Sequence, residues 1–305
     1  MTTILPPSIR HLPLRARLIG SVRRFFEADG YLEVETPCRI RAPAPELHID
    51  APPTGDWFLQ TSPELCMKRL LAAGCERIFQ ICRCFRAGER GRRHLPELTL
   101  LEWYAAGRDY RDLMVDCERL VAAVARDLGR GQTLVYQGRE VRLAPPWERL
   151  TVADAFERYA SIPVDAALAS DRFDEVMGLE IEPHLGFARP TLLCDYPPAC
   201  AALARIRPDD PPVAERFELY VAGIELCNGF SELADPVEQR LRFAAENEAR
   251  RRAGRTVYPP AEPFLADLAR MPPAAGNALG LDRLVMLFAD ADCIDEVVAF
   301  TPESL

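Results

Sequence analysis

The sequence predicts an α+β protein with a mainly antiparallel sheet flanked by helices. Two observations lead to this class. Stretches with strand character come in locally paired sets, 77–86 with 97–105 and 215–221 with 224–227. Helical stretches lie between these sets instead of following every strand. We therefore expect strands that are close in sequence to pair with each other, and the helices to pack against the sheet.

The first predicted elements are a long helix and a short strand. Residues 14–28 place apolar side chains on one helical face, and Gly30 ends this helix at the C′ position. A strand over Tyr31–Glu35 follows and ends at Pro37.

The next helix begins at a Ser-Pro-Glu sequence. Ser62 is the expected N-cap, Pro63 takes the first helical position, and Glu64 complements the helix dipole. Gly74 ends this helix. Further helices are expected at 111–129, 151–160, 237–252 and 282–289, and a last strand ends over Ala278–Gly280. No repeat or low-complexity linker interrupts them, so we expect residues 1–305 to form a single domain.

Composition excludes several classes of protein. Hydrophobic residues make up 49% of the 305 residues and charged residues 27%, which is ordinary for a globular protein with a sizeable core. No run of about 18 apolar residues occurs, so no segment is expected to cross a membrane. The first residues lack the apolar stretch and the cleavage site of a signal peptide. We therefore expect a cytoplasmic protein.

Cysteine spacing and charge give further limits. Ten cysteines are spaced without any C-x-x-C pair, so we expect no zinc site and thiols packed mostly in the core. Nucleic-acid binding needs clustered Lys and Arg, whereas the net charge here is −9. The strongest basic run, 250–252, is interpreted as a solvated helix end that compensates the dipole.

Three separated segments form a specific set. The first is 30–37, after a long helix. The second is Phe85-Arg86, followed by a loop and by 97–104. The third is 280–284, which opens a helix. Together and in this order they resemble motifs 1, 2 and 3 of class II aminoacyl-tRNA synthetases, which implies the antiparallel sheet of that class.

Two more segments resemble the lysyl branch of this class. Residues 61–64 followed by 67–71 resemble the start of its substrate-binding helix, and 224–233 resemble the region around its metal and lysine sites. Only about a dozen residues precede the resemblance, where a lysyl-tRNA synthetase carries an OB-fold, so no anticodon-binding domain is expected. The chain is therefore most similar to the elongation factor P lysine ligases, paralogues that attach β-lysine to a protein lysine.

This resemblance implies an ATP-dependent ligase that uses Mg²⁺. The enzyme would activate (R)-β-lysine, or lysine, as an adenylate, and then form an amide with a lysine ε-amino group of elongation factor P. The resemblance also implies a homodimer joined through residues 14–37, and makes tRNA an unlikely acceptor.

Two arginines are the expected catalytic residues. Adenylation brings an amino-acid carboxylate against the α-phosphate of ATP, so catalysis depends on orientation and on cationic screening. Arg86 stands at a predicted strand end and can present a planar fork to phosphate oxygens. By resemblance Arg86 holds the α-phosphate and Arg283 the γ-phosphate end. The other residues expected at ATP are Ala87, Gly88, Glu89, His94, Leu95, Leu98, Glu225, Leu226 and Gly280.

Two glutamates are expected to share one face of a hairpin. If Ala222 and Gly223 form the loop, Tyr220 faces Glu225, and Glu218 lies diagonally on the same face. Two such carboxylates repel unless a cation lies between them, and Mg²⁺ prefers oxygen ligands and phosphate partners. Glu218 and Glu225 are therefore the expected Mg²⁺ ligands.

The resemblance also defines an amino-acid pocket. It places Glu64 at the substrate amino group, and Tyr104 with Glu232 at the distal ammonium. Strand parity puts Glu102 and Tyr104 on one face with Leu98, which predicts that Tyr104 points inward. The remaining residues expected at the substrate are Ser62, Pro63, Asn228 and Ala278.

Several positions differ from the lysyl branch. Its members usually carry Glu, Asn and Phe around the adenine, where this chain has Gly88, Leu95 and Leu98. Leu98 keeps an apolar platform but loses ring stacking, worth on the order of 1 kcal/mol. Glu89, one residue away, is a candidate replacement for the missing Glu. Ala278 stands where lysyl-tRNA synthetases typically have Gly, and its methyl group would favour β-lysine.

Three alternatives to the ligase stay open. The first is a truncated lysyl-tRNA synthetase. The second is a free-standing amide synthetase on the same core, which Glu232 disfavours. The third is a subunit that binds or regulates without catalysis, and the altered loop after Arg86 is its support.

Overall fold

The computed structural model describes residues 7–209 and 211–305. Its strands are β1 (Leu32–Glu33), β2 (Arg39–Ile40), β3 (Pro53–Thr54), β4 (Trp57–Leu59), β5 (Arg77–Phe85), β6 (Glu97–Ala106), β7 (Thr133–Tyr136), β8 (Arg139–Arg142), β9 (Glu148–Thr151), β10 (Thr191–Tyr196), β11 (Ile206–Arg207), β12 (Val213–Val221), β13 (Ile224–Ser231) and β14 (Ala274–Gly280). Its α-helices are α1 (Pro7–Ala28), α2 (Glu64–Ala72), α3 (Tyr110–Asp127), α4 (Val152–Tyr159), α5 (Val164–Ala169), α6 (Phe173–Val176), α7 (Pro236–Arg252), α8 (Glu262–Leu268) and α9 (Leu281–Ala289).

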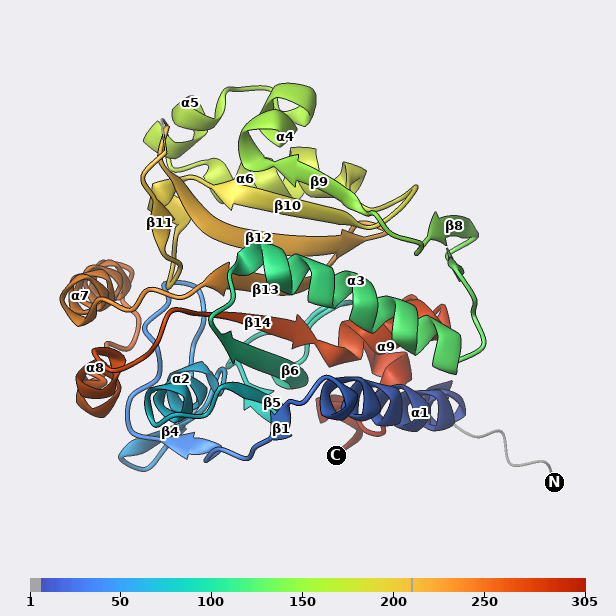
Figure 1. The fold of residues 1–305 in the computed structure, drawn as a ribbon, viewed down its shortest axis with the longest axis horizontal. Coiled ribbons are helices and arrows are strands. Elements are labelled where there is room, and N and C mark those ends of the chain that lie inside the picture. The colour runs from blue at the N-terminus through green and yellow to red at the C-terminus, as the bar shows by residue number, and fades with distance from the viewer. Residues whose placement is uncertain (1–6, 210) are drawn as a thin grey trace.

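One large sheet forms the centre of the protein (Figure 1). Its strand order is β1-β5-β6-β14-β13-β12-β10-β9, with β11 beside β12. Only the outermost pairs, β1 with β5 and β9 with β10, are parallel, and the other pairs are antiparallel. The predicted fold class, an antiparallel-dominated sheet flanked by helices, is confirmed.

The sheet has a separate hydrophobic core on each face, and strand parity decides which core a side chain joins. On β6, Leu101, Trp103 and Ala105 join the core that contains residues of α1, α3 and α9. The alternating residues Glu102 and Tyr104 point to the other face, where the second core contains residues of α2, α4 and α8. In Figure 1 α3 crosses in front of the sheet, so this other face lies behind it.

Two of the early elements differ in their ends from the prediction. The helix expected over 14–28 begins earlier, at Pro7, and Pro13 lies inside it without ending it. The strand expected over 31–35 shortens to Leu32–Glu33, because only these two residues pair with β5. Gly30 has a φ of 77°, as its predicted place after the helix requires.

The start of α2 also differs from the prediction. The helix begins at Glu64, and Pro63 is its N-cap residue without a capping side chain. Ser62 nevertheless accepts a hydrogen bond from the Glu64 backbone N–H at 3.0 Å. Its hydroxyl group therefore still satisfies one free N–H at the helix start, although it stands one residue before the cap.

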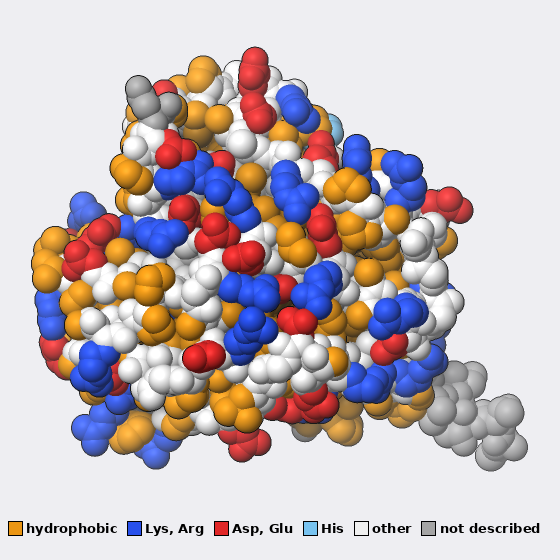
Figure 2. Space-filling view, viewed as in Figure 1, with side chains coloured by type: hydrophobic (Ala, Val, Ile, Leu, Met, Phe, Trp, Pro, Cys, Tyr) orange, Lys and Arg blue, Asp and Glu red, His pale blue; other side chains and the backbone are white. Residues whose placement is uncertain are grey.

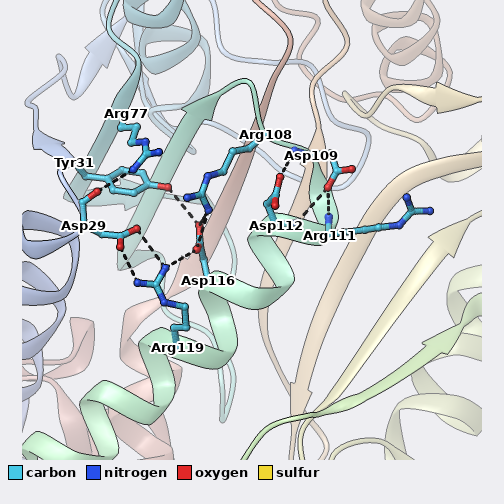
Figure 3. Close-up of polar contacts among 9 residues, drawn as sticks. All are labelled: Asp29, Tyr31, Arg77, Arg108, Asp109, Arg111, Asp112, Asp116 and Arg119. Atoms are coloured by element: carbon cyan, nitrogen blue, oxygen red, sulfur yellow. Dashed lines mark hydrogen bonds and ion pairs between the residues drawn. The ribbon is translucent and has the colours of Figure 1, made fainter.

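Charged side chains join the first helix and strand to α3 (Figure 3). Asp116 on α3 is buried, with Arg108 Nη1 at 3.2 Å and Arg119 Nη1 at 3.5 Å from its carboxylate. Arg119 also pairs with Asp29 at 2.7 Å, and the Tyr31 hydroxyl donates to Asp116 at 3.4 Å. Because a buried carboxylate needs cations around it, this cluster fixes the end of the first helix against α3.

Opposite charges are interspersed on the face shown in Figure 2. Some charged side chains of the protein form ion pairs, such as Arg149 with Glu118 at 3.2 Å. This face therefore offers no broad surface of one sign. Within the described residues, no helix is both long and apolar enough to cross a membrane.

Most cysteines pack in or against a hydrophobic core. Cys84, Cys117, Cys194 and Cys227 are buried, whereas the other six are partly or fully exposed. Cys75 and Cys200 are partly buried and pack against the second core, so six of the ten lie in or against a core, as predicted. Cys38, the one exposed thiol among the described residues, lies in the connection between β1 and β2.

Arg250, near the end of α7, is fully buried. Its guanidinium donates to the backbone oxygens of Glu46 at 2.6 Å and Ile49 at 2.9 Å, and to the Asp50 carboxylate at 2.6 Å. The prediction of a solvated basic run is therefore wrong for this residue. Its partners belong to the loop 43–52, which is distant in sequence, so the helical pattern alone could not reveal them.

Replacing Arg250 should destabilise the protein strongly. In Arg250→Met, the backbone oxygens of Glu46 and Ile49 lose their donor and the Asp50 carboxylate keeps only Arg255. The loss of these hydrogen bonds should cost about 1–3 kcal/mol for each group left unpaired. Urea unfolding should show this loss in the free energy of unfolding. The matched control is Arg251→Met, because the Arg251 side chain is 61% exposed. Equal midpoints for the two variants would contradict the structural role of Arg250.

Candidate active site

A cavity of about 330 Å³ opens on the sheet face opposite α3. Its wall contains side chains of β6, β12, β13 and β14, the start of α2, and the loops after β2 and β5. The following predicted site residues line it: Ser62, Glu64, Arg86, Glu89, His94, Leu95, Leu98, Tyr104, Glu218, Glu225, Leu226, Asn228, Ala278, Gly280 and Arg283. The structure thus brings the separated segments of the sequence into one place.

Four of the predicted site residues do not line the cavity. Ala87 and Gly88 are exposed in the loop after β5, and Pro63 is buried at the start of α2. Glu232 is only 2% exposed, and its carboxylate contacts Lys68 instead of the cavity.

A β-bulge in β13 lets residues that do not alternate share the cavity face. If the register next to the turn continued, Glu218 would pair with the residue before Asn228. One extra residue in β13 shifts the register, so that Glu218 pairs with Asn228. Leu226 and Cys227 are both part of the core on the α3 side. As a result Glu225 and Asn228, three positions apart, both line the cavity.

Three glutamates gather around one lysine at one end of the cavity, which we call the acidic end (Glu64, Glu102, Glu232 and Lys68). Lys68 Nζ lies 2.5 Å from Glu64 Oε1 and 2.5 Å from Glu232 Oε2. Its side chain is 1% exposed, and burial alone would lower its pKa. The charges of Glu232 and Glu64 outweigh burial and raise the pKa of Lys68, so it is an ammonium. Sequence reasoning missed this role, although Lys68 follows Glu64 at the i,i+4 helical spacing.

Glu102 is the second residue at the acidic end that sequence reasoning did not assign to the site. Its carboxylate accepts hydrogen bonds from Ser62 Oγ at 2.6 Å and from the Tyr104 hydroxyl at 2.8 Å. Tyr104 thus lies on the predicted face. Burial raises the pKa of Glu102 to about 7 and that of Glu232 to about 8. Both carboxyl groups therefore hold a proton for part of the time near neutral pH.

Gly276 on β14 makes room for the acidic end. A Cβ atom at this position would lie 2.1 Å from Tyr104 Cε1 and 2.5 Å from Glu232 Oε1. Any side chain there would displace both groups. The glycine is therefore required by packing, since its backbone φ needs no special freedom.

The opposite end of the cavity presents arginine side chains. Arg283 Nη1 donates to the backbone oxygen of Glu225 at 2.8 Å and to its Oε2 at 3.1 Å, while Nη2 lies 2.6 Å from His94 Nε2. Burial and Arg283 lower the pKa of His94, so its neutral ring can accept from the guanidinium. Arg86 Nη1 lies 3.7 Å from Glu89 Oε1, and Arg86 Nε is buried without a partner among the described residues. Such guanidinium groups suit an anionic ligand.

Glu218 and Glu225 could hold a divalent cation together with phosphate. Glu218 accepts from Arg216 Nη2 at 2.6 Å and from the Tyr220 hydroxyl at 2.7 Å. Burial, and then the charges of Glu218 and Glu225, raise the pKa of nearby Glu182, so negative charge accumulates here. No described group of three or more Asp, Glu, His or Cys could bind a metal unaided. The pair therefore fits Mg²⁺, which typically combines one or two carboxylates with phosphate oxygens.

Arg216 is a further site residue that the sequence did not indicate. Its Nε donates to Asn228 Oδ1 at 3.2 Å and its Nη1 to the backbone oxygen of Cys200 at 2.7 Å. Because Arg216 occupies the amide oxygen, Asn228 is left with its N–H groups to donate into the cavity. No motif marked this arginine, since its role depends on the β12–β13 pairing.

Comparisons with known proteins agree with this geometry. Residues 5–304 match the model of the family described as "tRNA synthetases class II (D, K and N)". The chain is 40% identical to a protein of Klebsiella pneumoniae named "Elongation factor P--(R)-beta-lysine ligase", over 96% of this chain and 95% of the relative. A Salmonella dublin protein of the same name is 39% identical over the same shares of both chains.

The acidic end should bind a ligand with two ammonium groups in a pH-dependent way. An ammonium favours the ionised carboxylate, so binding should release the protons held by Glu102 and Glu232. With pKa values of about 7 and about 8 in the free protein, affinity for lysine should be weak below pH 7 and rise through pH 8. Isothermal titration calorimetry at pH 7, in buffers of different ionisation enthalpy, would measure the released protons. The variant Glu232→Gln should release fewer protons when it binds lysine. A proton count of zero in the parent protein would contradict this linkage.

Proposed function

The chain belongs to the class II tRNA synthetase family of the D, K and N type, and from this premise we propose that it is an elongation factor P–(R)-β-lysine ligase. In this proposal the enzyme activates (R)-β-lysine, or lysine, with ATP and Mg²⁺. It then joins the activated acid to a lysine ε-amino group of elongation factor P. Because that partner is a translation factor, we place the enzyme in the cytoplasm.

The observation that carries the proposal is the charge balance of the acidic end. Three carboxylates, of Glu64, Glu102 and Glu232, face a single resident ammonium on Lys68. When all three are ionised, this region lacks two positive charges. A diamino acid such as β-lysine supplies both, whereas an amino acid with a neutral or acidic side chain does not. The names of the relatives agree with such a substrate.

The proposed first step forms the adenylate. An oxygen of the substrate carboxylate attacks the α-phosphorus of ATP, the bond to the bridging oxygen breaks, and pyrophosphate leaves. Arg86 would screen the α-phosphate, Arg283 the far phosphates, and the Asn228 N–H groups would orient the carboxylate. Mg²⁺ bound at Glu218 and Glu225 would supply further neutralisation of phosphate charge.

The proposed second step forms the amide. The neutral ε-amine of the acceptor attacks the acyl carbon of the adenylate and a C–N bond forms. The bond from the acyl carbon to the phosphate oxygen breaks, and AMP leaves with its electron pair. The amine must also lose a proton, which requires a base within reach of its nitrogen.

The altered loop after Arg86 is compatible with ATP in this proposal. Glu89 lines the cavity beside Arg86 and can supply the carboxylate that Gly88 lacks. Leu98 also lines the cavity and offers an apolar surface to the base. Ala278 pairs with Asn228 on the neighbouring strand, so its methyl group narrows the substrate pocket. We expect this narrower pocket to favour β-lysine over α-lysine.

Transfer to elongation factor P separates this function from that of a tRNA synthetase. With Mg·ATP and labelled (R)-β-lysine, label should appear as an amide on elongation factor P and not on total tRNA. The variant Arg86→Ala should lose both this transfer and pyrophosphate exchange by a hundredfold or more, since about 3 kcal/mol of transition-state stabilisation is removed. Label on tRNA alone would instead favour the alternative function, that of a lysyl-tRNA synthetase. The absence of exchange in the parent would favour a non-catalytic subunit.

We further propose that the chain forms a two-fold dimer through residues 14–37, as class II enzymes do. The cluster around Asp116 that holds the end of α1 would give this surface a fixed shape. Leu32, which is 59% exposed, would become buried at such an interface. Sedimentation equilibrium should give the dimer mass at micromolar concentration, and Leu32→Glu should shift it towards the monomer. A parent protein that stays monomeric at this concentration would refute the dimer.

A further inference from the structure

Glu46 is the carboxylate of the cavity wall that has no partner. Seven carboxylates line the cavity. Five of the others have the partners described above, and the sixth, Asp282, accepts from Arg15 at 2.6 Å and from the Thr99 N–H at 2.7 Å. Among the described residues, Glu46 is bonded only through its backbone oxygen, and its side chain makes no hydrogen bond or ion pair. A partly buried carboxylate left without a partner suggests that it serves a ligand.

The loop that carries Glu46 is held firmly in place. Arg250 binds the backbone oxygens of Glu46 and Ile49, and the backbone N–H of Leu47 donates to Glu246 Oε2 at 2.9 Å. The Ala87 N–H donates to the backbone oxygen of Asp50 at 2.7 Å, which ties the loop to the residue after Arg86. The backbone is therefore fixed while the carboxylate remains free to bind.

Charged groups from four elements act on the Glu46 carboxylate, and three of them, Arg86, Glu64 and Arg216, line the same cavity. Arg86 follows β5, Glu64 is on α2, Glu246 is on α7 and Arg216 is on β12. Burial raises the pKa of Glu46 to about 7, the two arginines oppose this rise, and the two glutamates add to it. Glu46 thus shares the cavity wall with Arg86 and Glu64, the groups proposed to hold the α-phosphate and the substrate amino group.

A free carboxylate at this place calls for a cationic or proton-donating ligand. The negative charges of the phosphates and of the substrate carboxylate would repel the Glu46 carboxylate, unless an amine lay beside it. In the proposed reaction three amines enter the site. The acidic end is assigned to the two of β-lysine, so the acceptor lysine remains.

We propose, on the basis of the function proposed above, that Glu46 is the general base of the transfer step. The acceptor nitrogen attacks the acyl carbon of the adenylate, the C–N bond forms, and the acyl–oxygen bond breaks to release AMP. The proton that the nitrogen must lose passes to a Glu46 carboxylate oxygen. The products are the amide, AMP and a protonated Glu46, which then returns its proton to solvent.

The two half-reactions test this role separately. In Glu46→Gln, pyrophosphate exchange with β-lysine should stay within a few fold of the parent. Single-turnover transfer from preformed adenylate to elongation factor P should fall about a hundredfold, the usual share of a general base. In the parent, the pH profile of transfer should show a midpoint near 7, where Glu46 ionises, and above it the rate should rise only with the neutral fraction of the acceptor amine. The pH profile of transfer by Glu46→Gln should lack this midpoint near pH 7.

Two further variants keep the test specific. Glu246→Gln removes a charge near Glu46 but retains an oxygen for the Leu47 N–H, so both half-reactions should remain close to those of the parent. In Glu46→Ala, added formate should restore part of the transfer rate without changing exchange, which a structural defect would not allow.

Each other outcome is decisive. Parental transfer by Glu46→Gln would overturn the role of Glu46 and leave the proposed function intact. An equal loss of exchange and transfer would also overturn it, because Glu46 would then act on the donor substrate or on adenylation. A parent enzyme that makes adenylate but never modifies elongation factor P would refute the proposed function, and this inference with it.

Discussion

Carboxylates that share one cavity repel one another, and the architecture of this site depends on how each is neutralised. Lys68 bridges Glu64 and Glu232 at 2.5 Å from each, in a place that solvent hardly reaches. At the other end Arg283 pairs with Glu225 at 3.1 Å. Removing one member of a buried pair costs about 3–5 kcal/mol, because the other charge is left without compensation. The cations are therefore as much part of the site as the glutamates that would contact ligands.

The sheet makes this crowding possible by separating two faces. Along β6 the residues Leu101, Trp103 and Ala105 belong to the core that contains residues of α1, α3 and α9, and the alternating residues Glu102 and Tyr104 are left for the other face. The bulge in β13 then changes the phase of one strand, so that Glu225 and Asn228 lie on the same face. Gly276 leaves the space into which Tyr104 fits. A regular strand with a side chain at this position could not bring these groups together.

The sequence predicted those parts of the fold and the site that follow from local pattern. Helix and strand periodicity gave the sheet and its hairpins, and parity correctly turned Tyr104 inward. The motifs indicated which residues gather at the cavity, although the role of each stays a prediction. Contacts between distant segments could not be predicted: Arg250 binds the backbone of Glu46 across 204 positions. The bulge that places Asn228 has no local signal either, because nothing in its sequence distinguishes it from regular strand.

The two ends of the cavity differ in whether they can adjust their charge. Guanidinium groups keep their proton in proteins, so the arginine end presents the same positive charge with or without a ligand. The carboxyl groups of Glu102 and Glu232, with pKa values of about 7 and about 8, can lower their mutual repulsion in the free protein by taking up protons. A ligand must displace those protons to gain ion pairs there. Only a molecule with ammonium groups can do so favourably, which makes the acidic end the selective part of the site. In the proposed function the arginine end would attract any phosphate and contribute mainly to catalysis.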